Sequence, residues 1–172
     1  MMNCETEKKM KLSEHFTLGE MTKTSYRLQG GNTPDSQATA NLRNLCENWL
    51  EELRYSYNTL YCLKPGEDYE SSKNVEGIVI NSGYRSEELN RKCWGAKSSN
   101  HLTGCAVDIR CLGKEQMLRY AAILIDLADD TKRDFDELIL ESRGTTYWIH
   151  LAVRPEDGHL GKNRRKLIFD FR

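Results

Sequence analysis

The sequence predicts an α+β fold, in which helices flank a central antiparallel sheet within a single domain. Helical patterns early and in the middle of the chain, together with several short apolar strands, favour this class. A chain of 172 residues is also long enough to bury a hydrophobic core without disulfide or metal staples. We therefore expect one domain over residues 12–172, preceded by a mobile leader over residues 1–11.

Two long amphipathic helices carry the helical part of this prediction. The first lies within residues 33–53, with Thr33 as N-cap and Pro34 as the first helical residue. Its apolar residues recur at helical spacing and predict a buried stripe of Ala38, Leu42, Leu45, Trp49 and Leu53. Ser86 is expected to cap a short helix. The second long helix is predicted over 114–129, where the buried face contains Met117, Ala121, Leu124 and Leu127.

Short runs rich in β-branched and apolar residues predict strands at 76–81, 104–110, 136–141 and 147–153, with a further one at KLIFDF near residue 172. Side chains alternate across a strand, so each strand has two distinct faces. Ile149 and Leu151 share an apolar face, which leaves His150 on the other. Asp108 lies opposite Val107 in the same way. Each strand thus has a second face with an ionisable group, and these faces predict a shared cleft.

Composition excludes several classes of protein. The 25 Lys and Arg residues balance 26 Asp and Glu, so no basic field indicates a nucleic-acid partner. No run of 18 apolar residues predicts a membrane span, and the first residues do not resemble a signal peptide. We expect synthesis in a reducing cytoplasm, where the six cysteines stay mostly buried free thiols, and we expect a monomer.

His101, Asp108 and His150 are the predicted ligands of one zinc ion per chain. Catalytic zinc takes three nitrogen or oxygen ligands and leaves a position for water. The metal lowers the pKa of that water, and a carboxylate is then needed as general base, for which Glu141 is the candidate. Arg85 is expected to stabilise a developing oxyanion.

The loop around these ligands supplies two further candidates. Ser99 is expected to hydrogen-bond substrate, and Gly104 is expected to allow a tight turn or a close backbone approach. Each charged residue also has a purely structural interpretation. Asp108 can pair with Arg110, Arg85 can pair with Glu88, and Glu137 and Glu141 can be ordinary edge-strand charges.

Four segments together resemble the zinc D-alanyl-D-alanine carboxypeptidase family: SGYRS from residue 82, SSNHLTGCAVDI from residue 98, FDELILE from residue 135 and WIH from residue 148. This family includes phage- and bacterium-associated peptidoglycan peptidases and the hedgehog signalling domain. The resemblance implies a hedgehog-like fold and zinc held by His101, Asp108 and His150. It also implies Glu141 as general base, Arg85 as the residue that stabilises the tetrahedral intermediate, and Ser99 and Tyr84 at substrate-binding positions.

The loop between Glu141 and His150 leaves one alternative open. A tight hairpin with Arg143 and Gly144 at its tip places Glu137 opposite His150, whereas a wider loop favours Glu141. We favour Glu141, because the resemblance places the catalytic Glu at the end of this strand.

The predicted function is a zinc metallopeptidase that hydrolyses peptide bonds of bacterial peptidoglycan, as a D,D-carboxypeptidase or a cell-wall endopeptidase. Its partners are then peptidoglycan stem peptides, which phage-type lysis would make accessible to a protein without a signal peptide. The alternative is a non-catalytic wall- or partner-binding module that keeps the fold.

Overall fold

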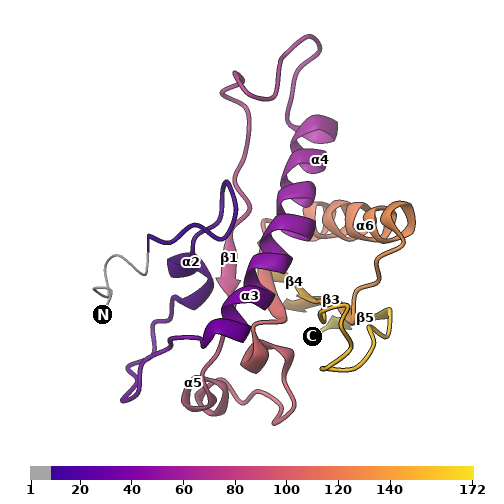
Figure 1. Ribbon diagram of the computed structural model, residues 1–172. Coiled ribbons are helices and arrows are strands. Elements are labelled where there is room, and N and C mark those ends of the chain that lie inside the picture. Colours follow the sequence, from indigo (N-terminus) through magenta and orange to yellow (C-terminus); the bar gives the residue numbers. More distant parts are fainter. Residues whose placement is uncertain (1–8) are drawn as a thin grey trace.

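The computed structural model describes residues 9–172 and shows a five-stranded mixed sheet with its long helices packed against one face (Figure 1). Residues 1–8, most of the predicted leader, lie outside the described residues. The leader therefore stays a prediction. Leu18 N–H already donates to the Met10 carbonyl at 2.8 Å, and Lys11 forms an isolated antiparallel bridge with Thr17.

The first long helix is built from three consecutive pieces that form one continuous rod (Figure 1). These are α3 (Ser36–Leu45), the π-helical η1 (Cys46–Leu50) and α4 (Glu51–Tyr61). The predicted stripe is confirmed, because Ala38, Leu42, Leu45, Trp49 and Leu53 are all buried.

The predicted start of that helix is wrong. The N-cap is Asp35, whose carboxylate accepts the Ala38 N–H at 2.7 Å. A carboxylate satisfies a free first-turn amide and also interacts favourably with the positive end of the helix dipole. The helix therefore begins after Asp35, with Thr33 and Pro34 outside it.

The remaining helices are α2 (Leu18–Thr22), α5 (Glu87–Lys92), the 3₁₀-helical η2 (Asn100–Thr103) and α6 (Lys114–Thr131). Ser86 caps α5 as predicted, by accepting the Leu89 N–H at 3.4 Å. In α6, Met117, Ala121 and Leu124 are buried as expected, while Leu127 is half-buried.

The sheet has the order β1-β2-β4-β3-β5. Its strands are β1 (Ile80–Ser82), β2 (Ala106–Cys111), β3 (Glu137–Arg143), β4 (Thr146–Ala152) and β5 (Lys166–Phe171). Three of the four pairings are antiparallel, as predicted. The exception is the edge strand β5, which runs parallel to β3.

The β3–β4 hairpin is tight, but it turns one residue later than the tight-hairpin alternative with Arg143 and Gly144 at its tip. Arg143 pairs with Thr146, so the two loop residues are Gly144 and Thr145. This register places Ile139, rather than Glu137, opposite His150. Glu137 and Glu141 consequently lie two residues to either side of that pair on the same face of β3.

The hydrophobic core lies between the helices and one face of the sheet. Apolar residues of the three central strands, among them Val107, Leu140 and Ile149, belong to one buried cluster with Trp49 and Leu124. Helices thus cover the apolar face of the sheet, as strand alternation predicts. The polar face of the central strands is left for the candidate site.

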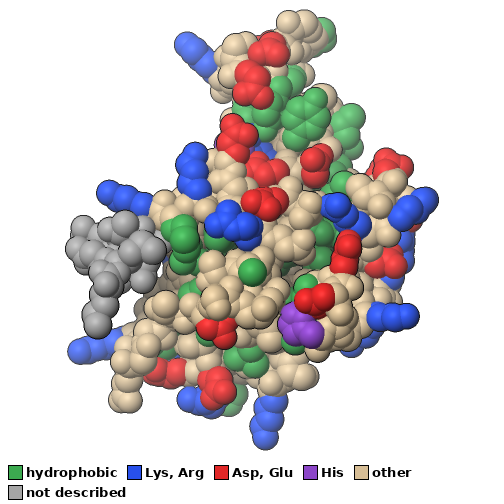
Figure 2. Space-filling view, in the orientation of Figure 1, with side chains coloured by type: hydrophobic (Ala, Val, Ile, Leu, Met, Phe, Trp, Pro, Cys, Tyr) green, Lys and Arg blue, Asp and Glu red, His purple; other side chains and the backbone are tan. Residues whose placement is uncertain are grey.

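Charge and thiol chemistry agree with the composition. Figure 2 shows acidic and basic side chains interspersed over the visible face, with no large field of one sign. Among residues 9–172, all five cysteines are free thiols, and three of them are buried. No helix within these residues has the length and apolar character needed to cross a bilayer.

Candidate functional site

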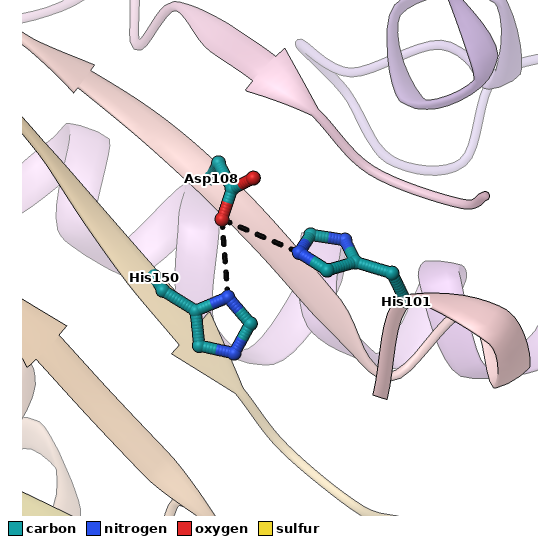
Figure 3. A group of neighbouring side chains, drawn as sticks. All are labelled: His101, Asp108 and His150. Atoms are coloured by element: carbon teal, nitrogen blue, oxygen red, sulfur yellow. Dashed lines mark hydrogen bonds and ion pairs between the residues drawn. The ribbon is translucent and has the colours of Figure 1, made fainter. Parts of the chain in front are cut away.

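His101, Asp108 and His150 converge at the polar face of the sheet (Figure 3). Each offers one ligand atom, and these atoms lie within 4.8 Å of one another. Asp108 in β2 and His150 in β4 are direct cross-strand partners. His101 reaches the same point from η2, which immediately precedes β2. Three residues separated along the chain therefore form one cluster, as predicted.

The ring of His101 is held in a defined orientation. Its Nδ1 lies 2.6 Å from the Gly83 carbonyl, and its Nε2 lies 3.3 Å from Asp108 Oδ1. A carbonyl oxygen only accepts hydrogen bonds, so Nδ1 carries the proton and the Nε2 lone pair faces the cluster. Burial lowers the pKa of His101 more than the Asp108 carboxylate raises it, so this ring favours the neutral form that binds metal.

Gly104 fixes the position of η2, as the sequence predicts. It ends η2 in the left-handed region with φ +71°. A Cβ at this position would lie 2.3 Å from the Ala38 carbonyl oxygen. Both the turn and the close approach therefore require glycine, and together they let η2, which carries His101, pack against α3.

His150 lies between two carboxylates. Its Nδ1 is 3.0 Å from Asp108 Oδ1, and its Nε2 is 3.7 Å from Glu137 Oε2. Burial lowers the pKa of His150, but the hydrogen bond to Asp108 and the nearby Glu137 carboxylate outweigh this and raise the pKa to about 9. For Asp108, burial raises the pKa, but the two imidazole rings outweigh it and hold the pKa far below its usual range.

This donor set fits a zinc ion. Two imidazoles and one carboxylate are the ligand types of catalytic zinc sites, which leave a coordination position open. Asp108 Oδ1 is shared by both rings, so the three donors face a common point. The His101 contact with the Gly83 carbonyl is the kind of outer contact that orients a metal-binding histidine.

The cluster lies at the base of a pocket of about 590 Å³. The walls contain both predicted glutamates and Trp148 from the β3–β4 hairpin. Ser98 and Ser99 come from the loop that leads into η2, and Asn100 is the first residue of η2. Four arginines also contribute: Arg85, Arg143, Arg154 and Arg164. The pocket therefore combines a metal-binding cluster with carboxylates and cationic side chains.

The two glutamates in this pocket have opposite electrostatic environments. Burial, followed by the nearby Asp108 charge, raises the pKa of Glu141, and a hydrogen bond from Trp148 Nε1 at 2.9 Å opposes this increase. For Glu137, the contact with His150 lowers the pKa to about 2, and Arg164 and Lys166 act in the same direction. Glu141 is therefore the stronger base of the two.

Arg85 and Ser99 both line the pocket, and their roles stay predictions. Arg85 pairs with Asp108 Oδ2 through Nη2, and its Nε donates to Ser82 Oγ at 2.8 Å. Ser99 Oγ accepts the His101 N–H at 3.4 Å and thereby caps η2. Tyr84 is different, because its side chain packs against the hydrophobic core and does not line the pocket. Its assignment to substrate binding stays a prediction.

The polar residues next to the metal-binding cluster were not predicted from the sequence. Asp136 is fully buried and accepts hydrogen bonds from Arg164 and from Asn100. The residue pair FD at the start of the FDELILE segment is the only signal for Asp136. Arg164 follows β4 in a segment without a recognisable motif, so no sequence pattern pointed to it.

A comparison with protein families supports this assignment. A family model described as Peptidase M15 matches residues 67–151, a stretch that contains all three clustered ligands and Glu141. This part of the chain is similar to the peptidase M15 family. The predicted resemblance to zinc D-alanyl-D-alanine carboxypeptidases is thereby confirmed, together with the α+β fold. A comparison with curated proteins finds no match.

The match to the M15 family supports a peptidase, that is, a hydrolase of peptide bonds. M15 peptidases are zinc-dependent, and the His101, Asp108 and His150 cluster has the donors that zinc requires.

Proposed function

We propose that this protein is a zinc peptidase that hydrolyses peptide bonds of bacterial peptidoglycan, as a D,D-carboxypeptidase or a cell-wall endopeptidase. One observation carries the catalytic part of this proposal: the three clustered ligands and Glu141 share one pocket on the polar face of the sheet. The substrate class rests on the resemblance to peptidoglycan peptidases.

In this proposal, His101, Asp108 and His150 hold the metal. When bound, zinc acidifies a water molecule and polarises the scissile carbonyl. Glu141 accepts the water proton and delivers it to the leaving amine. Its raised pKa supports this role, because a carboxyl group that must gain and lose a proton works best when its pKa is closer to neutral.

Two further residues have positions consistent with substrate binding. The Arg85 guanidinium is anchored through Nε and Nη2, while its Nη1 has no hydrogen-bond partner among residues 9–172. This free edge is available for an oxyanion. The Ser99 hydroxyl accepts from a backbone amide and keeps its own proton, so it can donate to a substrate carbonyl or carboxylate.

The deciding experiment is mass spectrometry of muropeptides incubated with the zinc-loaded protein. We expect new products that identify the cleaved bond. Glu141→Gln should retain zinc and lose on the order of 10²-fold or more in kcat, as expected for the loss of a general base. His150→Ala should lose both zinc and activity. His159→Ala is the matched control, because His159 is exposed and pairs with Asp157 outside the pocket.

Two outcomes would contradict the proposal. Metal-free protein with unchanged activity would exclude zinc chemistry. Binding to sacculi without new products, unaffected by Glu141→Gln, would instead indicate the non-catalytic module.

A further inference from the structure

The chain segment that follows β4 returns to the pocket and reaches its polar wall. Residues 153–165 connect β4 to β5 and lie outside the stretch that matches the M15 family. Two arginines of this segment, Arg154 and Arg164, nevertheless line the pocket. The Arg164 guanidinium makes three hydrogen bonds to two carboxylates. Its Nε and Nη2 donate to Asp136 at 2.8 and 2.7 Å, and Nη2 also donates to Glu137 Oε1 at 2.8 Å.

Asp136 is the buried anchor of this group. Its carboxylate is fully buried, and two ion pairs balance its negative charge. Arg164 lies 2.7 Å from the carboxylate and Arg154 lies 3.1 Å from it. Asn100 Nδ2 donates to the same carboxylate at 2.9 Å. A buried carboxylate with two cations and an amide donor is well satisfied, so the position of Arg164 is strongly determined.

Glu137 connects this anchor to a metal ligand. One carboxylate oxygen, Oε1, accepts from Arg164, while Oε2 faces His150 Nε2 at 3.7 Å. Nδ1 of the same imidazole faces Asp108 at the metal-binding cluster. When one ring nitrogen of a histidine binds a metal, a carboxylate beside the other ring nitrogen fixes the orientation and tautomer of the ring. Such a carboxylate thereby supports metal binding.

We propose that Glu137 and Arg164 are positioning residues for His150. Arg164, anchored on Asp136, holds Glu137, and Glu137 holds the Nε2 edge of the ring so that Nδ1 faces the metal position. The proposal rests on the zinc site of the proposed function, and it makes a segment outside the matched family region part of that site.

The neighbouring residue Arg165 provides a matched control. It too pairs with two carboxylates, Asp129 and Asp134, but these lie outside the pocket. Loss of Arg165 therefore removes a cation and two ion pairs without touching Glu137. Any effect specific to Arg164 then reflects its contact with the site rather than the loss of a charge from this segment.

The test measures zinc affinity by competition with a chromophoric chelator, which requires no substrate. Glu137→Ala should weaken zinc binding about tenfold or more, and Arg164→Ala roughly three- to tenfold, within the range known for outer contacts of metal ligands. Arg165→Ala should stay within about twofold of wild type. If Arg164 acts through Glu137, the double variant should bind zinc no more weakly than Glu137→Ala alone.

Arg164→Lys guards against a folding defect in Arg164→Ala. Lysine keeps a positive charge beside Asp136, but a single ammonium cannot reproduce the planar fork that bridges both carboxylates. In the cobalt-substituted protein, we expect a shifted visible absorption band for Arg164→Lys and an unchanged band for Arg165→Lys. A merely structural role would leave the band of the folded protein unchanged.

The outcomes separate this proposal from the proposed function. If wild type binds zinc and the Arg164 variants bind it equally well, the positioning role is wrong and the zinc site stands. Additive losses in the double variant would also overturn the proposal, because they would show that the two residues act independently. Wild-type protein without zinc affinity would overturn the metal site itself.

Discussion

At the scale of single residues, Glu137 and Glu141 show how placement decides the chemistry of identical side chains. Both lie on the polar face of β3 and both line the pocket. Glu137 is surrounded by cations and donors, which hold its pKa near 2, whereas burial and the Asp108 charge raise the pKa of Glu141. Glu141 is therefore the more basic of the two carboxylates in the pocket.

Trp148 provides a direct test of the assignment of Glu141 as the base. Its indole N–H donates to Glu141 Oε2 at 2.9 Å and stabilises the ionised form. Removing this donor in Trp148→Phe should therefore raise the Glu141 pKa. Because the base acts only when ionised, the acidic limb of the kcat/KM profile should move to higher pH than in wild type.

The pH profile of peptide hydrolysis measures this effect, and Trp94→Phe is the control, because Trp94 is 95% exposed and absent from the pocket lining. An acidic limb that is unchanged in Trp148→Phe, or displaced to lower pH, would argue against Glu141 as the group that titrates.

The sequence predicts individual site residues where their position depends on local alternation. Asp108 and His150 follow from the two faces of β2 and β4, since neighbouring side chains point in opposite directions. Arg164 does not follow, because its contact with Glu137 depends on how the chain returns after β4. Tyr84 shows the converse, since a motif position next to Arg85 turns toward the core.

At the scale of elements, the sequence predicts where helices and strands lie better than how they end. Two possibilities were open for the β3–β4 connection, a tight turn at Arg143 and Gly144 or a wider loop, and the hairpin has a tight turn at Gly144 and Thr145. Moving the turn by one residue changes the partner of His150 from Glu137 to Ile139, because each step of the turn moves the pairing by two residues. Hydrophobic alternation is the same in both registers, so it cannot distinguish them.

The π-helical turn of η1 is also invisible in the sequence pattern. Cys46, Trp49 and Leu50 are all buried there, so this part of the rod presents a broader apolar surface than a regular stripe. Helical periodicity predicts a continuous helix within residues 33–53 but neither its extension to Tyr61 nor the local change in its hydrogen bonding.

Two glycines at element ends permit a matched prediction about stability. Gly104 and Gly144 both have positive φ, +71° and +57°, but only Gly104 faces a close neighbour, the Ala38 carbonyl oxygen. Gly144→Ala should lower the free energy of unfolding by about 1 kcal/mol, the conformational cost of a left-handed non-glycine residue. Gly104→Ala adds a backbone clash and should cost roughly 2–4 kcal/mol.

Chemical denaturation of the metal-free proteins measures both differences. Gly30→Ala is the control, because Gly30 has neither a positive φ nor any atom within 4 Å of the position that a Cβ would occupy. Equal losses for Gly104→Ala and Gly144→Ala would show that α3 moves away without cost, and that the position of η2 does not depend on this approach.

At the scale of the whole molecule, one face of the sheet forms the hydrophobic core and the other face forms the candidate site. The apolar face packs against the helical rod and α6, while the polar face holds the ligands and the pocket. The antiparallel strands of this arrangement were predicted from the sequence. The parallel edge strand β5 was not, because the direction of a strand depends on the path of its connection rather than on its side chains.

Metal binding should couple this site to the stability and protonation of the whole protein. In the metal-free protein, His150 has a pKa of about 9 and is protonated at pH 7, while burial keeps His101 neutral. Zinc requires neutral imidazoles, so binding at pH 7 should release roughly one proton, and apparent affinity should rise about tenfold from pH 7 to pH 8. Zinc at about 100 times its Kd should add about 2.7 kcal/mol to the free energy of unfolding.

Calorimetry in two buffers of different ionisation enthalpy counts the released protons, and thermal unfolding with and without zinc measures the stabilisation. His150→Ala should lose both effects, whereas His15→Ala should keep both, because His15 pairs with Glu51 on the rod and is not part of the cluster. Wild-type protein that binds zinc without releasing a proton would show that His150 is already neutral. In that case the carboxylates of Asp108 and Glu137 would not raise the pKa of His150 above 7. The stabilisation by zinc should then be independent of pH between 7 and 8.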